Sequence, residues 1–297
     1  METKELHYAA PPLHKTFLAK FFDYFLVLIL GGTLFAISQW ILPSVPVYSK
    51  ANNYQMTLRL QSRLYVEENE ELESLSSYVN KQDWTRKEKA EHYEEELTYF
   101  FTSFLGDSTQ YVEDKSSAKA NGENLFLVDG SWAFSAADYE PSYLAFYENE
   151  YQNVALGLLH EYPDYRNSSR AILLTEIVDA FVCFSFSHTL LLLVIPFCFR
   201  RGKKTLGLFF AHIGRVGKDG LSISAGRHLL LWLFDFAFLF LGSIVAFLIP
   251  LGISIGMTLL RQDHQSLGEY VIGVHLVDDS EQRIFVNSFE IIESHQK

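Results

Sequence analysis

Three long apolar runs constrain this chain more than any other feature of its sequence. Residues 17–42 and residues 171–199 contain two charged side chains each, and residues 228–260 contain one. About 20 apolar residues suffice for a helix to cross the hydrocarbon core of a bilayer. We therefore expect an all-α membrane protein with three or four transmembrane passages.

The third run, residues 228–260, is too long for one helix that crosses the bilayer directly. Its 33 residues would form a straight helix of about 50 Å, whereas the hydrocarbon core is about 30 Å thick. A helical hairpin that turns near residues 242–243 or at residues 250–252 fits this length and returns the chain to the side from which it entered. One steeply tilted helix is the alternative, and it would leave three passages.

Charge is distributed unevenly along the chain. Residues 43–169 contain 10 Lys and Arg against 22 Asp and Glu, whereas the other residues contain 14 of each, and the formal net charge is −12. A chain of this charge without a long basic run is unsuited to nucleic acid, because phosphate binding requires clustered Lys and Arg. The acidic excess therefore belongs to one central segment.

The basic loop at residues 200–227 predicts the orientation in the membrane, because cytoplasmic loops carry an excess of Lys and Arg. One crossing back from this loop places the acidic segment, residues 43–170, outside the cell. A second crossing places the N-terminal tail, residues 1–16, in the cytoplasm. With the hairpin, the C-terminal segment, residues 261–297, is cytoplasmic as well. A polar tail ahead of the first run argues against a cleaved signal peptide.

The acidic segment is expected to be mainly helical. Residues 51–79 place apolar side chains at helical spacing among charged neighbours, and Thr85 and Glu88 have the spacing of a capping box. A further helix is expected over residues 143–160, where apolar side chains recur on one face.

This last helix carries an aromatic face. Tyr143, Phe146, Tyr147 and Tyr151 lie on or near one side of it. Such a face is compatible with a contact surface for a membrane or secreted protein partner, because aromatic residues are enriched at interfaces. It is equally compatible with the core of the segment itself.

Two short segments with strand patterns are expected on the cytoplasmic side. Residues 209–224 and residues 270–286 each contain two short apolar stretches separated by a turn rich in Gly or Asp. We expect each segment to form a β-hairpin. Because short strands leave unpaired edges, the two hairpins could pair with each other.

Several short motifs lie at the cytoplasmic ends of the apolar runs. They are HKTFLAKFFDYF at the start of the first run, GKKTLG at 202–207, GKDG at 217–220, AGRHLL around Arg227 and RQDHQSLGEYVIGVHLV at 261–277. In these motifs the chain resembles the RDD family of bacterial membrane proteins, which is named for one arginine and two aspartates. The resemblance covers roughly residues 13–42 and 171–278 and leaves the acidic segment outside.

The chain departs from the family pattern at three positions. The family's arginine falls at or next to Lys15, which keeps the charge but lacks the planar donor fork of arginine. Glu269 occupies the position of the second aspartate, and Leu208 replaces a lysine. Some members of this family are associated with monovalent cation/proton exchange. The resemblance therefore implies a multi-pass protein of the bacterial plasma (inner) membrane that transports monovalent cations and protons.

Ionisable side chains inside the apolar runs are the first candidate functional residues. A charge at bilayer depth costs about 2.5–3.5 kcal/mol on insertion scales, so such groups usually face protein or water. Asp23 and Asp235 each lie six or seven residues into a run that enters from the cytoplasmic side, so they could share a proton or a cation at one depth. Lys15, Lys20 and Arg227 are candidate charge partners. A structural pair between Lys20 and Asp23, one helical turn apart, is the competing interpretation.

Four further residues are candidates, two for binding protons or cations and two for an outer vestibule. His188 lies near the middle of the second run, where it suits a proton relay or a plain hydrogen bond to a neighbouring helix. Glu269 could bind a cation or hold the basic loop in place. Glu176 and Asp179 share one helix face near the outer end of the second run, where they could form an outer vestibule or a solvated interfacial pair.

Motifs of common enzyme classes are missing from the sequence. It contains no H-E-x-x-H, Walker A, G-x-S-x-G, EF-hand or paired C-x-x-C pattern, and its two cysteines, Cys183 and Cys198, lie in an apolar run. We therefore expect no enzyme activity, no cofactor and no metal site. Two functions remain open. One is cation/proton exchange, for which a homo-oligomer would help to form an aqueous path, and the other is a non-transporting scaffold that binds a partner through residues 43–170.

Overall fold

The chain folds as two compact units in the computed structural model, which describes residues 8–69, 71–133, 136–246 and 248–295. Unit 1 consists of Met1–Trp40 and Val178–Lys297, and unit 2 is the intervening Ile41–Ile177. Unit 2 contains the whole of the acidic segment, whereas unit 1 contains most of the apolar runs and the basic loop.

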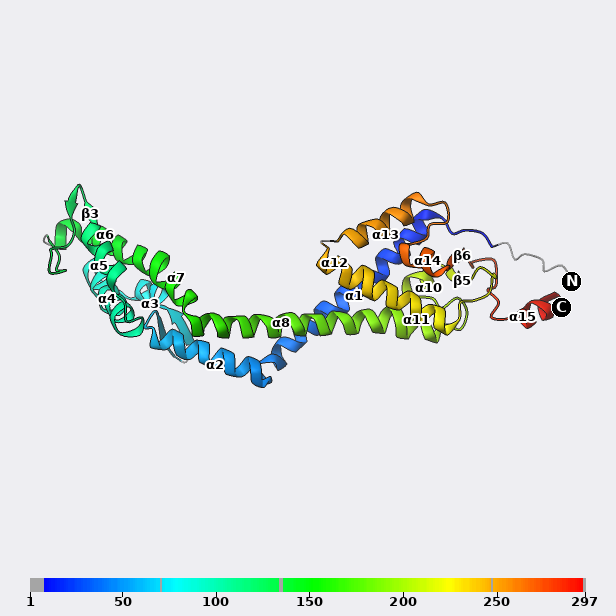
Figure 1. The fold of residues 1–297 in the computed structure, drawn as a ribbon, viewed down its shortest axis with the longest axis horizontal. Helices are drawn as coiled ribbons and strands as arrows, with labels where there is room; N and C mark the ends of the chain where they lie inside the picture. Colours follow the sequence, from blue (N-terminus) through cyan, green and yellow to red (C-terminus); the bar gives the residue numbers. More distant parts are fainter. Residues whose placement is uncertain (1–7, 70, 134–135, 247, 296–297) are drawn as a thin grey trace. The chain divides into compact units, whose positions relative to one another are not determined.

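Unit 1 is built mainly from helices (Figure 1). Its elements are α1 (Leu13–Ile41), the end of α8 (Pro163–Thr189), a π-helical turn (Leu190–Val194), α9 (Ile195–Cys198), α10 (Leu206–Phe210), β5 (Ile213–Val216), α11 (Ala225–Phe234), a second π-helical turn (Asp235–Leu241), α12 (Gly242–Val245), α13 (Ile249–Leu260), α14 (Leu267–Ile272), β6 (His275–Asp278) and α15 (Ser288–His295). The first π-helical turn comes just before Pro196, which has no N–H to donate to a regular α-helical turn.

Three helical stretches among the described residues are long and apolar enough to cross a membrane: Leu13–Ser44, Pro163–Cys198 and Ala225–Val245. Many of their apolar side chains are exposed, and on α1 the side chains of Leu18 and Leu28 are 66% and 60% exposed. In water such a surface would associate with other apolar surfaces, whereas in a bilayer it faces lipid. The chain is therefore a helical membrane protein.

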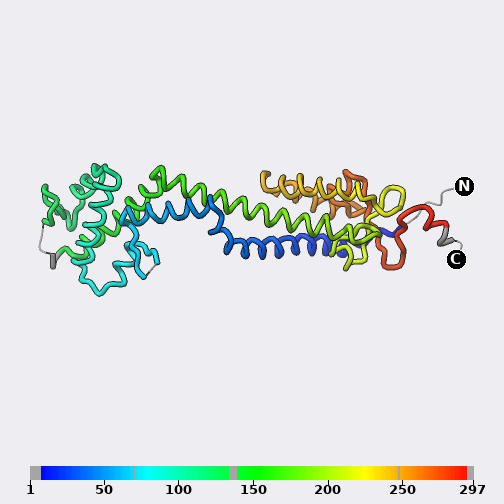
Figure 2. The backbone as a smooth tube through the Cα atoms, turned by 90° about the horizontal axis from the view of Figure 1, so that it is seen from below, coloured from blue at the N-terminus to red at the C-terminus, as the bar shows by residue number. Residues whose placement is uncertain are grey.

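The third apolar run reverses direction between Val245 and Ile249. α12 and α13 contact each other, and α13 runs back beside the second π-helical turn (Figure 2). The reversal falls between the two turn positions that the sequence suggested, residues 242–243 and 250–252. Gly242 and Pro250, one from each position, face each other across it. A Cβ added to Gly242 would lie 3.5 Å from Cγ of Pro250. With 12 residues, α13 is about 18 Å long, shorter than the hydrocarbon core.

The two segments with strand patterns pair with each other instead of folding back on themselves. β5 and β6 are antiparallel, with Val216 opposite His275. The hairpin expected at residues 209–224 is reduced to a single bridge from Val216 to Ser222. In the second segment β6 forms in the later part of the expected first strand, and α14 takes up its start, because Ser266 and Glu269 form a capping box that starts a helix. The expected second strand, at residues 283–286, does not form. The prediction of two β-hairpins was wrong, whereas the pairing between the segments is confirmed.

Unit 2 is mainly helical. Its elements are a 3-10 turn (Leu42–Ser44), α2 (Pro46–Gln61), β1 (Tyr65–Glu68), β2 (Glu71–Ser74), α3 (Leu75–Lys81), α4 (Arg86–Tyr99), a π-helical turn (Phe100–Phe104), α5 (Thr109–Ser117), β3 (Lys119–Ala120), β4 (Glu123–Asn124), α6 (Ala136–Asn149), a further π-helical turn (Glu150–Ala155), α7 (Leu156–Glu161) and the start of α8. The capping box predicted at Thr85 and Glu88 is confirmed at the start of α4.

An aromatic core holds unit 2 together. α4 packs against α6, and Tyr93, Tyr143 and Tyr147 are fully buried there. Tyr151 is buried as well, and Phe146 packs against the same core. The aromatic face expected on this part of the chain is therefore the interior of unit 2, and these side chains are not available as a contact surface for a partner.

The helix expected over residues 51–79 is interrupted. α2 ends at Gln61, and β1 and β2 form an antiparallel pair in which Val66 lies opposite Glu73. Asn69, between the two strands, has a φ of 52°, a left-handed conformation that asparagine tolerates better than most residues. The strands are rich in glutamate, which is disfavoured in strands, so side-chain preference gave no sign of them.

Candidate functional site

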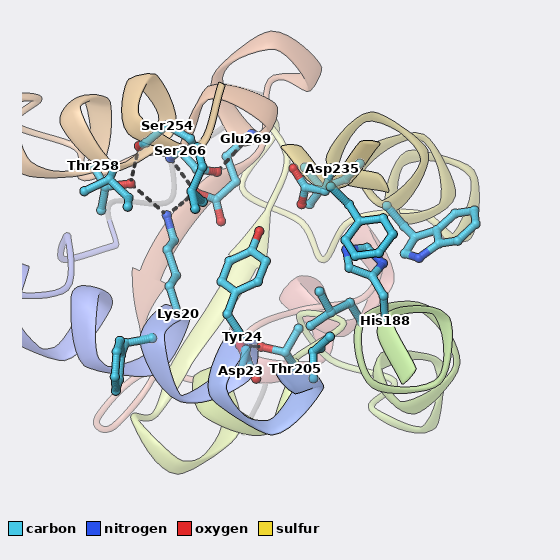
Figure 3. Close-up of a pocket in the computed structure, with 18 of the residues that line it drawn as sticks. Lys20, Asp23, Tyr24, His188, Thr205, Asp235, Ser254, Thr258, Ser266 and Glu269 are labelled. Carbon is cyan, nitrogen blue, oxygen red and sulfur yellow. Dashed lines mark hydrogen bonds and ion pairs between the residues drawn. The ribbon is translucent and has the colours of Figure 1, made fainter. Parts of the chain in front are cut away.

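Helical elements of unit 1 line a partly open cavity of about 340 Å³. α1, α8, α11 with its π-helical turn, α13 and α14 contribute side chains to it (Figure 3). The polar and ionisable residues that line it are Lys20, Asp23, Tyr24, His188, Thr205, Arg215, His228, Asp235, Ser254, Thr258, Ser266 and Glu269. The cavity thus brings together all four residues that the sequence proposed as proton or cation ligands.

Asp23 anchors the loop after α9 to α1. Its carboxylate accepts a hydrogen bond from the hydroxyl of Thr205 and another from the backbone N–H of Gly207 at 2.7 Å. Thr205 is also the N-cap of α10, so Asp23 binds at a helix start, where free N–H groups favour a negative charge. Only glycine permits this approach at position 207, since a Cβ there would lie 2.0 Å from the carbonyl oxygen of Ala19.

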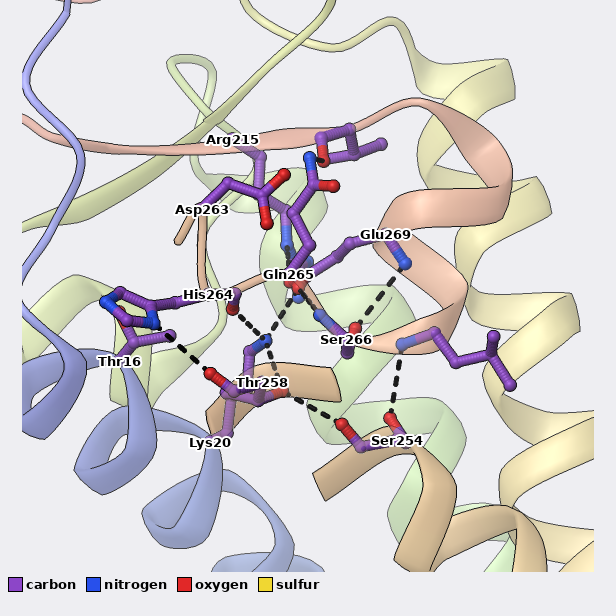
Figure 4. Close-up of polar contacts among 12 residues, drawn as sticks. Thr16, Lys20, Arg215, Ser254, Thr258, Asp263, His264, Gln265, Ser266 and Glu269 are labelled. Atoms are coloured by element: carbon purple, nitrogen blue, oxygen red, sulfur yellow. Dashed lines mark hydrogen bonds and ion pairs between the residues drawn. The ribbon is translucent and has the colours of Figure 1, made fainter. Parts of the chain in front are cut away.

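Glu269 is a second anchor, which joins α14 to α1 and β5 (Figure 4). Its Oε2 lies 2.6 Å from Nζ of Lys20 and 2.8 Å from the backbone N of Ser266, and its Oε1 lies 4.0 Å from Nε of Arg215. Its side chain is only 2% exposed. Burial by itself raises the pKa of Glu269, but the positive charges of Lys20 and Arg215 lower it overall, so the carboxylate is ionised.

Lys20 connects α1 with the end of α13 and the loop that follows. Besides its bond to Glu269, its ammonium group donates to the hydroxyl of Thr258 at 3.5 Å and to the carbonyl oxygen of His264 at 3.3 Å. An ammonium group has three N–H donors, so these three acceptors satisfy it. Lys20 and Asp23 therefore each bind a remote part of the chain, and they do not form the local pair that their spacing suggested.

Asp235 is the acidic residue of the cavity that has no hydrogen-bond or ion-pair partner among the described residues. Its Oδ1 is buried and accepts no hydrogen bond from any residue that the structure describes. It lies against α14, where a Cβ at Gly268 would be 2.5 Å from this oxygen. Asp235 also begins a π-helical turn, a local irregularity that is frequent at functional sites. Figure 3 shows Asp235 and Glu269 facing one space, with the hydroxyl of Tyr24 directed toward them.

His188 projects into the cavity from α8. It is 1% exposed, and neither of its ring nitrogens has a hydrogen-bond partner among the described residues. Its ring contacts those of Trp232, Phe236 and Phe240, with centroids 5.4–6.4 Å away. The hydrogen bond to a neighbouring helix that the sequence left open is therefore not formed.

The residues that the sequence proposed as further charge partners or as an outer vestibule lie outside the cavity, and each contacts another part of the protein. Lys15 pairs with Asp278 at 3.1 Å, Arg227 packs against Gly217, Asp179 accepts hydrogen bonds from Ser38 and Gln39, and Glu176 accepts one from Tyr48. Lys15, Arg227, Glu176 and Asp179 therefore contact neighbouring segments and do not line the cavity.

Arg215 is the charged cavity residue that the sequence did not single out. It counted only as one of seven basic side chains in residues 200–227. All four residues of β5 are buried, and the side chain of Arg215 is 10% exposed beside Glu269. Its burial depends on β6 and α14, which are far away in sequence, so the loop composition carried no signal of it.

Comparison with protein-family models, with curated proteins and with solved structures gives no match for this chain. The fold and the cavity therefore define its class, a helical membrane protein with a buried cluster of ionisable residues. Among the described residues, no three His, Cys, Asp or Glu side chains are arranged as ligands for a metal ion.

Proposed function

We propose that the chain is an RDD-like membrane carrier that exchanges a proton for a monovalent cation at the cavity beside Asp235. The observation that carries this proposal is the unpartnered, buried Oδ1 of Asp235. A carboxylate removed from water without a hydrogen bond is costly, and a bound proton or cation relieves that cost.

The charge balance of the cavity supports a one-for-one exchange. Two basic side chains, Lys20 and Arg215, face three acidic ones, Asp23, Asp235 and Glu269. When all five are ionised the cavity has a net charge of −1, which one proton or one monovalent cation neutralises. Because both would neutralise the same charge, they compete, and competition is the basis of exchange.

The acidic residues have different roles in this proposal. Asp23 and Glu269 hold the loops around the cavity through hydrogen bonds and an ion pair, so they position the site. Asp235 is free to bind and release the exchanged species. His188, with two unpartnered ring nitrogens, relays protons to and from the cavity.

The proposed topology follows from the basic loop and the resemblance to the RDD family. The N-terminus and residues 200–227 lie in the cytoplasm of a bacterial cell, and unit 2 lies outside. α13 returns part of the way toward the cytoplasmic side. Three full crossings and one short helix are few for an aqueous path, so we propose that the carrier works as a homo-oligomer.

Proton flux in proteoliposomes tests the proposal. A pH gradient is imposed, Na⁺, K⁺ or Li⁺ is added, and wild type is compared with Asp235→Asn. We expect one of the cations to collapse the gradient in wild type and not in the variant. Asp179→Asn is the matched control, because it removes a carboxylate of α8 that lies outside the cavity, and it should retain flux.

Two results would contradict the proposal. If no cation collapses the gradient with wild type, the chain is not an exchanger, and a non-transporting scaffold becomes the better interpretation. If Asp235→Asn retains the wild-type flux, the cavity is not the site of exchange.

A further inference from the structure

A second hollow of unit 1, with a volume of about 690 Å³, lies where α9 ends. Four basic side chains line it: Arg200, Arg201, Lys204 and Arg283. The acidic residues in its wall are Asp279 and Glu281. The hollow is therefore positively charged and suited to an anion.

Two of the four basic groups are already neutralised. Lys204, only 9% exposed, forms an ion pair with Asp279. Arg201 lies 3.5 Å from Glu290, a residue of α15. These pairs fix one wall of the hollow and connect it to β6 and α15.

The other two basic groups, the guanidinium groups of Arg200 and Arg283, form no hydrogen bond or ion pair with any residue that the structure describes. Both side chains are exposed. The pKa of Glu290 is lowered first by the backbone N–H of Val286 and then by Arg201, Arg283 and Arg200. All three arginines thus act on Glu290, which pairs with Arg201 alone among the described residues.

The hollow adjoins the end of a membrane-crossing helix. Arg200 comes two residues after Cys198, the last residue of the stretch Pro163–Cys198. Exposed aromatic side chains lie near this point. Phe209 lines the hollow, Phe210 follows it in the chain, and Phe197 directly precedes Cys198; they are 44%, 66% and 41% exposed. Aromatic and basic side chains together are typical of the level at which lipid headgroups lie.

We propose that this hollow binds the phosphate group of an anionic phospholipid through Arg200 and Arg283. A guanidinium group presents a planar fork of donors that matches the oxygens of a phosphate. The exposed phenylalanines lie where the acyl chains of the same lipid begin. An inorganic phosphate ion offers the same oxygens but no chains, so it would use the arginines alone.

Native mass spectrometry of the full-length protein tests this assignment by counting retained lipids. The purified protein is titrated with phosphatidylglycerol, with phosphatidylcholine and with inorganic phosphate. We expect one phosphatidylglycerol to bind in preference to phosphatidylcholine, and Arg200→Gln/Arg283→Gln to weaken that binding by about 30-fold. Lys218→Gln/Arg227→Gln is the control, since it removes two basic groups of the same loop outside the hollow.

A second readout locates the lipid. Cys198 lines the hollow and is exposed, whereas Cys183 is buried. Alkylation of Cys198 by a maleimide should be slower in nanodiscs with phosphatidylglycerol than in pure phosphatidylcholine. The difference should vanish in the arginine double variant and persist in the control.

The possible outcomes separate the sources of phosphate. If inorganic phosphate protects Cys198 as well as phosphatidylglycerol does, the lipid assignment is overturned and the hollow is a site for a phosphate ion. Equal retention of both phospholipids, or equal weakening by the control variant, would overturn the site altogether.

Discussion

Lys20 donates a 2.6 Å hydrogen bond to Glu269, although Asp23 lies only one helical turn away from it on α1. Asp23 in turn accepts hydrogen bonds from Thr205 and Gly207. Two neighbouring charges of opposite sign thus bind two different segments of the chain. As a result α1 holds both α10 and α14 in place beside the cavity in which Asp235 lies.

The contributions of Lys20 and Glu269 to the free energy of unfolding are expected to be coupled, because the two side chains form an ion pair. Removal of one partner leaves the other charge buried and unpaired, which typically costs 3–5 kcal/mol. Lys20→Met and Glu269→Gln should each lower the unfolding temperature in detergent. The double variant Lys20→Met/Glu269→Gln should lose less than the sum of the two, with a coupling energy of about 1–3 kcal/mol. Strict additivity of the two single variants would show that the pair contributes nothing.

The close approach of α10 to α1 predicts a steric effect at Gly207. A Cβ there would lie 2.0 Å from the backbone oxygen of Ala19, so α10 must move away and weaken its bond to Asp23. We expect Gly207→Ala to lower stability by about 1–3 kcal/mol, the usual cost of overpacking. Thermal unfolding, followed by the loss of the folded species in size-exclusion chromatography, measures this loss.

The matched control for this substitution is Gly226→Ala. Gly226 lies in α11, and a Cβ there would have no atom within 4 Å. Alanine is preferred to glycine inside a helix by about 1 kcal/mol, so this variant should be as stable as wild type or more stable. If both variants behaved alike, the contact between α10 and α1 would not be a tight one.

Replacement by asparagine is expected to change the stability of the protein differently at Asp23 and at Asp235. Asp23→Asn loses charge-assisted hydrogen bonds to Thr205 and Gly207, so it should destabilise by about 1.5–3 kcal/mol. Asp235→Asn replaces a carboxylate that has no partner by a neutral group, so it should be neutral or stabilising. Parallel unfolding curves of the two variants in detergent measure the difference, and an equal loss would show that Asp235 holds a structural bond.

The membrane helices could be predicted from the sequence, whereas the partners of their charges could not. Long apolar runs leave a helix little alternative in lipid, because every backbone N–H must be satisfied within the segment. The bond between Thr205 and Asp23, in contrast, joins residues that are 182 positions apart, and Lys20 and Glu269 are 249 apart. Local spacing favoured a pair between Lys20 and Asp23, and tertiary packing overrode it.

The residues of the candidate site likewise divide into those that the sequence indicates and those that only the folded structure reveals. Asp23, Asp235 and His188 could be singled out because an ionisable group in an apolar run is itself unusual. Arg215 could not, since it lies among many basic residues and its burial arises only when β5 pairs with β6. That Asp235 has no partner is likewise a property of the assembled fold and not of its sequence neighbours.

Glu150, in the core of unit 2, is expected to make the stability of that unit depend on pH. It is 3% exposed, and its Oε2 has no hydrogen-bond partner among the described residues. Burial, and to a smaller extent the charge of Asp114, raise the pKa of Glu150 from 4.5 to about 7. The folded unit therefore prefers the protonated form of Glu150, and well below pH 4.5 both the folded and the unfolded state are protonated. As the pH rises from 4.5 to 7 the unfolded chain loses its proton first, so the free energy of unfolding falls.

The expected loss is about 2 kcal/mol between pH 5 and pH 8, since one pKa unit corresponds to about 1.4 kcal/mol. Trp84 and Trp132 report on unit 2, so urea unfolding can be followed by fluorescence after Trp40 and Trp232 are replaced by Phe. Glu150→Gln in this background should remove the difference, because glutamine does not titrate. Glu113→Gln, which changes an exposed carboxylate of α5, should leave the difference in place. A pH dependence that survived Glu150→Gln would assign the effect to another buried group of unit 2.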